Sequence, residues 1–151
     1  MHRIPVRQIM TDTVITIHPE ELVADAAQLM EEFELRRLPV VDDDDSLVGI
    51  VTDSDVLQAE AAGSALRNYE PGVEAEWLTV ADIMTREVVT IGVDATVGQL
   101  ATKMIEHKVG GVPVVEIFPH AANNEHLVGI VTETDICQMI ADAWAREAAK
   151  K

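Results

Sequence analysis

The sequence predicts an α+β fold made of two copies of one β-α-β-β-α pattern. The stretch LVGIVTDSDV at residues 47–56 returns as LVGIVTETDI at residues 127–136. Two further segment pairs, IMTDTVITI with IMTREVVTI and LPVV with VPVV, each repeat 74 residues apart. A chain of 151 residues that carries one pattern twice is expected to form two small related domains. Each is short enough that it would be only marginally stable by itself.

The first repeat opens with a short strand after IMT and continues into an amphipathic helix. Apolar residues recur at helical spacing from Leu22 to Phe33, which predicts a helix with one buried face. Pro19, directly before Glu20 and Glu21, favours a helix start there, because proline is tolerated in the first turn and acids suit the N-terminal dipole.

The second repeat has the same helix with different end signals. Its apolar residues keep helical spacing from Val97 to Ile105. Asp94 is expected to cap the helix N-terminus, and Gly110 with Gly111 to stop it.

Each helix is followed by two β-branched runs that predict a buried hairpin, and then by another helix. The second repeat has six extra residues between its paired strands, so EIFPHAANNEH is expected to form a loop. The last helix carries an apolar stripe at helical spacing: Ile136, Met139, Ile140, Ala143 and Trp144.

The pattern sets the expected domain boundaries: residues 1–66 form the first repeat, 67–79 a linker, and 80–151 the second repeat with its C-terminal helix. We expect the two sheets to pack against each other around a pseudo-two-fold axis, with the helices outside and a cleft between the repeats. Shared burial would stabilise units of this size.

Composition excludes several classes of protein. A net charge of −16 opposes nucleic-acid binding, which depends on Lys and Arg neutralising phosphates, and an anionic ligand would need a local positive cluster. The chain has no stretch typical of a signal peptide or a membrane span, and its single cysteine, Cys137, fits a reducing compartment. We therefore expect a cytoplasmic protein, with an aliphatic core because aromatic residues make up only 3% of the chain.

The chain resembles the tandem CBS domain pair, or Bateman module. Three repeated elements carry the resemblance: IMT before a short strand, LPVV or VPVV, and LVGIVTDSD or LVGIVTETD. The resemblance covers nearly the whole chain. It implies a regulatory module that senses adenine-containing ligands (AMP, ADP, ATP or S-adenosylmethionine) in the cleft between the repeats and needs no cofactor. It also implies a homodimer in which four repeats form a flat disc.

The resemblance also implies which residues bind the ligand. The threonine of the repeated corner contacts phosphate and the aspartate holds ribose hydroxyls, which gives Thr52 with Asp55 and Thr132 with Asp135. The adenine walls would come from Val88 and Val109 at the first site, and from Val14 and Leu35 at the second. Burial alone accounts equally well for these four apolar residues.

The two sites are expected to be unequal. Arg36 and Arg37 precede LPVV, whereas Gly110 and Gly111 occupy the same places before VPVV. A guanidinium suits phosphate geometry, so the Thr52 site would take a nucleotide, and the other site would be weaker, vacant or suited to an uncharged adenosyl ligand.

Each of these motifs has a structural alternative. A threonine followed three residues later by an acid is also a helix capping box. The two arginines could instead pair with Glu31, Glu32 or Glu34. The acid run from Asp42 to Asp45 falls at a strand-to-strand turn, where a solvated turn is expected, although a cation could be recruited there.

These observations leave two candidate functions and speak against a third. The first is an adenine-nucleotide sensor, linked to energy status, whose shape is read by an effector protein in trans. The second is a dimeric interaction scaffold that binds no ligand. An enzyme is not expected, because the chain has no Walker loop, dinucleotide fingerprint, zinc-ligand spacing or nucleophile elbow.

Overall fold

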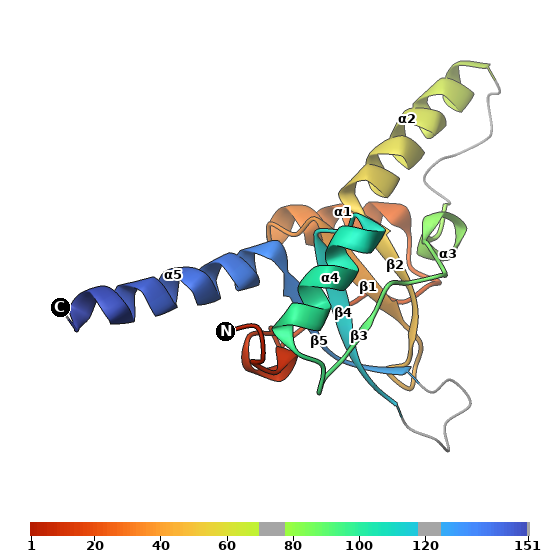
Figure 1. Ribbon diagram of the computed structural model, residues 1–151. Coiled ribbons are helices and arrows are strands. Elements are labelled where there is room, and N and C mark those ends of the chain that lie inside the picture. The colour runs from red at the N-terminus through yellow and green to blue at the C-terminus, as the bar shows by residue number, and fades with distance from the viewer. Residues whose placement is uncertain (70–77, 118–124, 151) are drawn as a thin grey trace. The chain divides into compact units, whose positions relative to one another are not determined.

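The computed structural model of the chain describes residues 1–69, 78–117 and 125–150, and of residues 63–69 only the backbone (Figure 1). The chain divides into two compact units. The first unit is Ile15–Val88, and the second unit combines Met1–Val14 with Val89–Lys151. Each contains one small sheet with helices, which confirms the predicted α+β class.

The first unit contains α1 (Val23–Glu32), β1 (Arg37–Val41), β2 (Leu47–Thr52), α2 (Asp53–Tyr69) and α3 (Val80–Ile83). Strands β1 and β2 form the predicted antiparallel hairpin. The strand expected after the first IMT is reduced to a single parallel bridge between Ile17 and Val40. Helix α2 runs three residues past residue 66, and linker residues 70–77 lie outside the described residues.

The second unit contains η1 (Val6–Gln8), β3 (Ile91–Gly92), α4 (Val97–His107), β4 (Gly111–Ile117), β5 (Glu125–Thr132) and α5 (Glu133–Ala149). The sheet order is β3-β4-β5, with β3 parallel and β5 antiparallel to β4. The strands extend into the segment expected to be an inserted loop, because Glu116 pairs with His126 and Ile117 with Glu125. Residues 118–124 of that loop lie outside the described part of the chain.

Aliphatic residues form the core of each unit, as the composition predicts. Within the described residues, no aromatic side chain is buried. The buried core residues of the first unit come from both strands and all three of its helices: Ile17, Val23, Ala26, Met30, Leu38, Val40, Val51, Val56, Ala59 and Val80. In the second unit they are Val6, Ile91, Leu100, Met104, Val112, Val114 and Val131.

The predicted start of the first helix was wrong. Helix α1 begins at Val23 rather than beside Pro19. A bridge between Leu22 and Thr79 explains the delay, because it holds Leu22 extended, and the backbone N–H of Val23 donates to Leu78 O at 2.9 Å. This contact joins residues more than 50 positions apart and leaves no local signal.

Both predicted ends of the second helix were also wrong. The N-cap of α4 is Thr96, whose Oγ1 accepts the N–H of Gln99 at 3.2 Å, while Asp94 forms an ion pair with Arg7. The helix ends at His107, and Lys108 is the C-cap with a left-handed φ of 54°. Glycine is the commonest residue at a left-handed helix cap, so the C-terminal end of the helix was predicted at Gly110 and Gly111, beyond its observed end.

Each IMT segment pairs with the hairpin of the other repeat rather than with its own. Thr11 exchanges backbone hydrogen bonds of 2.8 and 2.9 Å with Ile130, so the first IMT pairs with the hairpin of the second repeat. Thr85 makes the same pair with Ile50, with bonds of 2.9 and 3.0 Å. A unit therefore needs both repeats to complete its backbone pairing.

Glycine is required where each IMT segment crosses its hairpin. A Cβ added to Gly49 would lie 2.6 Å from Met84 Sδ and 3.1 Å from Thr85 O. A Cβ added to Gly129 would meet Met10 Sδ at 2.6 Å and Thr11 O at 3.0 Å. The glycine in both LVGIV stretches thus provides room for the methionine of IMT.

We expect Gly49→Ala to lower the free energy of unfolding by about 1–3 kcal/mol, because overpacking a close contact forces neighbours to shift. Gly92→Ala is the matched control, since nothing lies within 4 Å of the added Cβ, and its effect should stay within about 0.5 kcal/mol. Urea unfolding followed by circular dichroism measures both. Equal midpoints for the two variants would contradict the close approach.

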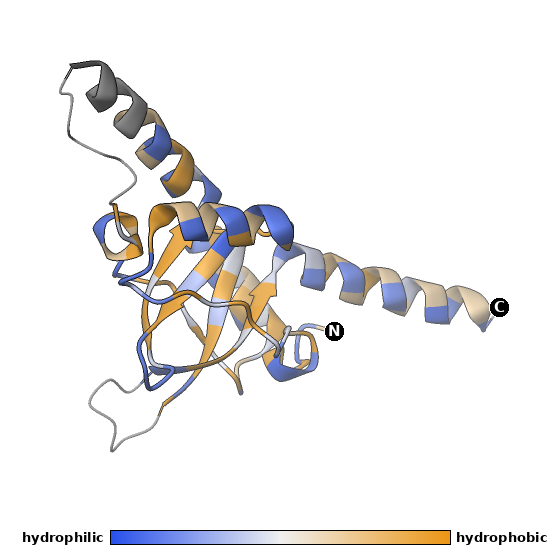
Figure 2. Cartoon of the chain, turned by 180° about the vertical axis from the view of Figure 1, so that it is seen from behind, coloured by the Kyte–Doolittle hydropathy of each residue, from blue (hydrophilic) through white to orange (hydrophobic). Residues whose placement is uncertain are grey.

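Helix α5 leaves the sheet at the end of β5 and has no buried residue (Figure 2). Ile136, Met139 and Ala143 of its apolar stripe are half-buried, whereas 48% of Ile140 and 73% of Trp144 are exposed. The described helices include none with the length and apolar character needed to cross a bilayer.

Candidate functional site

The corner where β2 passes into α2 contains the first pair of predicted ligand residues. The backbone N–H of Thr52 donates to Asp55 Oδ2 at 2.9 Å, and the N–H of Asp55 donates to Thr52 Oγ1 at 3.2 Å. This reciprocal pair is a capping box, as the structural alternative predicted. Both side chains are half-buried, and Asp55 Oδ1 makes no hydrogen bond within the described residues. One carboxylate oxygen and the hydroxyl hydrogen of Thr52 therefore remain available for a ligand.

Arg36 and Arg37 lie at this same corner. Arg37 pairs with Thr52 across the hairpin, and the backbone N–H of Asp53 donates to Arg36 O at 2.8 Å. Arg36 is exposed and Arg37 half-buried. Neither forms an ion pair in the described part of the chain, so the alternative that they pair with neighbouring glutamates was wrong. The corner thus has two guanidinium groups without a carboxylate partner.

The corner between β5 and α5 has the same backbone hydrogen bonds, but its side chains and their hydrogen bonds differ. Gly111 pairs with Thr132, and the N–H of Glu133 donates to Gly110 O at 3.0 Å. Asp135 Oδ2 accepts both the N–H of Thr132 at 2.8 Å and its hydroxyl at 3.3 Å. The threonine hydroxyl is therefore already a donor to the protein, and no guanidinium replaces the two glycines.

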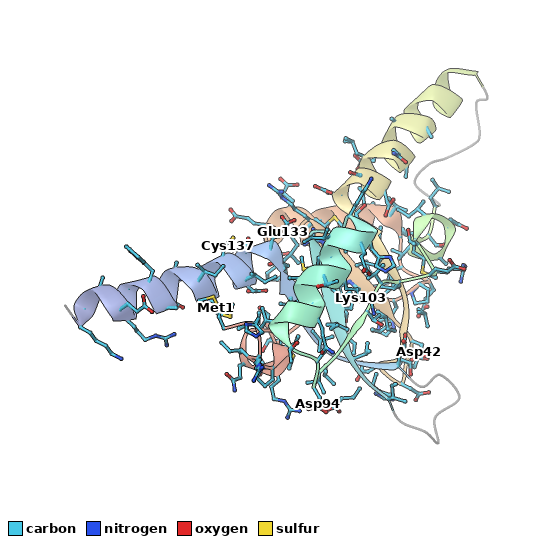
Figure 3. The ribbon with its side chains drawn as sticks, in the orientation of Figure 1. Met1, Asp42, Asp94, Lys103, Glu133 and Cys137 are labelled. Atoms are coloured by element: carbon cyan, nitrogen blue, oxygen red, sulfur yellow. The ribbon has the colours of Figure 1, made fainter. Side chains whose placement is uncertain are left out.

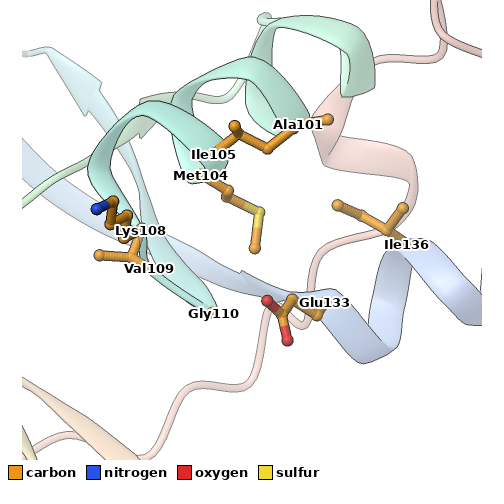
Figure 4. A pocket seen from close by; sticks show the side chains of 8 residues that line it. All are labelled: Ala101, Met104, Ile105, Lys108, Val109, Gly110, Glu133 and Ile136. Carbon is orange, nitrogen blue, oxygen red and sulfur yellow. The ribbon is translucent and has the colours of Figure 1, made fainter.

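A pocket of about 440 Å³ lies beside the second corner, between the end of α4 and the start of α5 (Figure 4). Its walls are mostly apolar, with Lys108 and Glu133 as charged members. Val109 and Gly110 of the predicted site line it, but Thr132 and Asp135 do not. Asp135 instead lines a second pocket of about 330 Å³ formed by η1 and α5, and Arg146 lies on the wall of that pocket. Figure 3 locates Glu133 at the start of α5.

The four predicted adenine walls are all half-buried, so each retains accessible apolar surface. Val88 belongs to the same unit as Thr52, and Val14 to the same unit as Thr132. Leu35 and Val109 pack against the core of their own units, which accounts for their partial burial.

The structure therefore brings the predicted polar residues together in two groups. Arg36, Arg37, Thr52 and Asp55 meet at one corner, and Gly110, Gly111, Thr132 and Asp135 meet at the equivalent corner of the other unit. Sequence reasoning did not assign Glu133 or Arg146 to these surroundings, because both lie on a helix whose neighbours are decided by tertiary packing.

The CBS domain model matches residues 6–62 and 80–142, which covers both hairpins and both corners. The chain belongs to the CBS domain family. It is 32% identical to the L-aspartate semialdehyde sulfurtransferase of Methanocaldococcus jannaschii over 89% of this chain. It is 30% identical to hypoxic response protein 1 of Mycobacterium tuberculosis, over 90% of this chain and 85% of that protein.

This CBS chain spans only part of several relatives. It covers 23% of the length of the sulfurtransferase and 32% of another Methanocaldococcus jannaschii protein that is 35% identical. Two solved structures are similar over nearly their full lengths. The CBS domain pair of protein MJ0100, in complex with 5-methylthioadenosine and S-adenosyl-L-methionine, is 32% identical with a TM-score of 0.72, over 92% of this chain and 97% of that one. CBSX2 in complex with AMP is 25% identical with a TM-score of 0.74, over 93% and 98%.

We expect Thr52→Ala to lower the free energy of unfolding by about 0.5–2 kcal/mol without any ligand, because the N–H of Asp55 loses its acceptor at the helix start. Ser54→Ala is the control, since the Ser54 side chain makes no hydrogen bond within the described residues. Urea titration of the two variants and the unmodified chain provides the comparison. A Thr52→Ala midpoint equal to that of Ser54→Ala would show that the hydroxyl does not cap α2.

Proposed function

We propose that this chain is a regulatory module that binds an adenine-containing ligand, and that the Thr52/Asp55 corner is its main nucleotide site. The observation that carries the proposal is that Arg36 and Arg37 lie at the same corner as Asp55 and form no ion pair with the described residues. One carboxylate oxygen of Asp55 likewise accepts no hydrogen bond from them. The arginines supply the local positive charge that a phosphate needs on a chain of net charge −16. The carboxylate oxygen suits a ribose hydroxyl.

The solved relatives support an adenosyl ligand. One binds AMP, and another binds 5-methylthioadenosine and S-adenosyl-L-methionine, two ligands without a phosphate. AMP, ADP or ATP is the ligand class that fits a corner with arginines. Apolar walls from Val88 and Val109 would enclose the adenine ring.

The Thr132/Asp135 corner is proposed as a weaker or vacant site, or one for an uncharged adenosyl group, with Val14 and Leu35 as its apolar walls. Gly110 and Gly111 provide no charge, and the Thr132 hydroxyl already donates to Asp135. A phosphate there would lack both the guanidinium and the hydroxyl donor that the first corner offers. The free Oδ1 of Asp135 can still accept from a ribose hydroxyl.

We further propose that the ligand acts by favouring one geometry of a homodimer of four repeats, and that an effector protein reads this geometry in the cytoplasm. A ligand shifts such an equilibrium only through its different affinity for the two shapes. The role is regulatory rather than catalytic, and sensing of cellular energy status would follow if AMP and ATP bind with different effects. A ligand-free dimeric scaffold is the second candidate, because capping alone accounts for the hydrogen bonds of both corners.

We expect the double variant Arg36→Ala/Arg37→Ala to bind AMP about tenfold to a hundredfold more weakly, because charge-assisted hydrogen bonds contribute about 1.5–3 kcal/mol. Asp55→Ala should weaken binding similarly, whereas Asp135→Ala should leave the stronger site intact. Arg86→Ala is the control for the loss of an exposed arginine, since Arg86 lies in the same unit and its side chain donates to Ala81 O. Isothermal titration calorimetry measures affinity and stoichiometry.

Two equal sites that both survive the arginine substitutions would overturn the proposed inequality. If no adenosyl compound binds or raises the melting temperature, and both aspartate variants change stability alone, the scaffold becomes the better account.

We expect Trp144→Ala to shift the chain towards monomer, because Trp144 is the most exposed member of the α5 stripe and would lose apolar burial in a dimer. Sedimentation equilibrium or light scattering over a concentration series measures the mass. Arg146→Ala on the same helix is the control. An unchanged mass for Trp144→Ala would place the dimer contact elsewhere.

A further inference from the structure

Three potential metal ligands meet at the closed end of the β1–β2 hairpin in the first unit. Within the described residues, His18, Glu20 and Asp43 each offer one ligand atom, and these atoms all lie within 4.8 Å of one another. His18 Nδ1 is 3.9 Å from Asp43 Oδ1. The sequence separates His18 from Asp43 by more than 20 residues, so only the fold brings them together.

The backbone around this group is firmly held. Ile17 bonds β1 through its N–H to Pro39 O at 3.1 Å and through its carbonyl to the N–H of Val41 at 3.0 Å, which places His18 beside the end of β1. In the turn that follows, Asp42 Oδ1 accepts the N–H groups of Asp44 and Ser46. Asp42 therefore caps the turn, and the Asp43 side chain is exposed.

The imidazole of His18 has a nitrogen that the protein does not satisfy. Nδ1 is buried and has no hydrogen-bond partner among the described residues, although 41% of the His18 side chain is exposed. A buried polar atom without a partner is costly. The carboxylates of Glu20 and Asp43 are exposed and accept no hydrogen bond in the part of the chain described, and the neighbouring Glu21 accepts the backbone N–H of His18. His18 Nδ1 thus lies 3.9 Å from an Asp43 oxygen, and the Glu20 carboxylate has an oxygen in the same group of ligand atoms.

We propose that His18 Nδ1, Glu20 and Asp43 bind one divalent transition-metal ion, with zinc as the best-suited probe. Imidazole nitrogen with carboxylate oxygen is a ligand set that zinc accepts, and three protein ligands leave a fourth position for water. Metal–ligand bonds of about 2.0–2.2 Å place tetrahedral ligand atoms roughly 3.4 Å apart. The observed atoms need to approach by about an ångström, which the exposed Glu20 and Asp43 side chains can do by rotation.

This metal site is separate from the nucleotide corner. Thr52 pairs with Arg37 at the open end of the hairpin, while Val41 pairs with Leu47 next to the turn. Five strand residues at about 3.3 Å each separate the two ends by roughly 15 Å. Metal binding therefore does not rest on the proposed adenosyl function, and either can fail without the other.

Calorimetric titration of the full chain with zinc chloride, in about 0.15 M salt to screen diffuse attraction, is the direct test. We expect one zinc ion per chain, binding at least tenfold more weakly in His18→Gln and in Asp43→Asn. Asp44→Asn is the matched control, because it removes the same charge from the same turn but lies outside the ligand group. Cobalt(II) supplies a second readout, since its visible absorption should intensify on binding and fall in His18→Gln.

Zinc binding that Asp43→Asn and Asp44→Asn weaken equally would show only diffuse attraction to an acidic surface and would overturn the site. The absence of any stoichiometric zinc binding would do the same. Melting temperatures measured with chelator present confirm that each variant is folded. Should His18→Gln fail to fold, Glu20→Gln replaces it, because this exposed side chain makes no contact that folding requires.

Discussion

The exchange of IMT segments between the repeats is the constraint on which the rest of the structure depends. Backbone pairs of Thr11 with Ile130 and of Thr85 with Ile50 tie the start of each repeat to the hairpin of the other. Neither repeat completes its own backbone pairing, so each compact unit contains residues from both repeats. The glycines at 49 and 129 permit the crossing because any side chain there would meet a methionine sulfur.

The exchange also involves the hairpins that lead into both candidate corners. Each hairpin is fixed on one side by an IMT segment, and its last strand then passes directly into a helix whose first turn is capped by the Thr and Asp of the repeated motif. One carboxylate oxygen of each aspartate accepts a backbone N–H, which holds the side chain in place. The proposed ligand would use the other carboxylate oxygen, which accepts no hydrogen bond from the described residues.

The two corners share one backbone arrangement and differ in the charge beside it. Arg37 and Gly111 each pair with the threonine of their own corner. The carbonyls of Arg36 and Gly110 accept equivalent hydrogen bonds from the first residue of the following helix. Backbone geometry is therefore preserved while the electrostatics differ. At the opposite end of the first hairpin, the acidic turn is held by Asp42, so that Asp43 is free to face His18.

The sequence by itself determined the α+β class, the two hairpins, the corners and the unequal charges beside them, because strand periodicity, capping motifs and repeat offsets are local or additive signals. Only the tertiary structure decided where α1 begins, because a long-range bridge holds Leu22 extended. The start of α4 was misplaced although its capping pair, Thr96 and Gln99, is local in the sequence. Tertiary structure also decided which repeat each IMT segment joins, and that His18 meets Asp43. Such contacts depend on the path of the chain through space, which no short stretch of residues encodes.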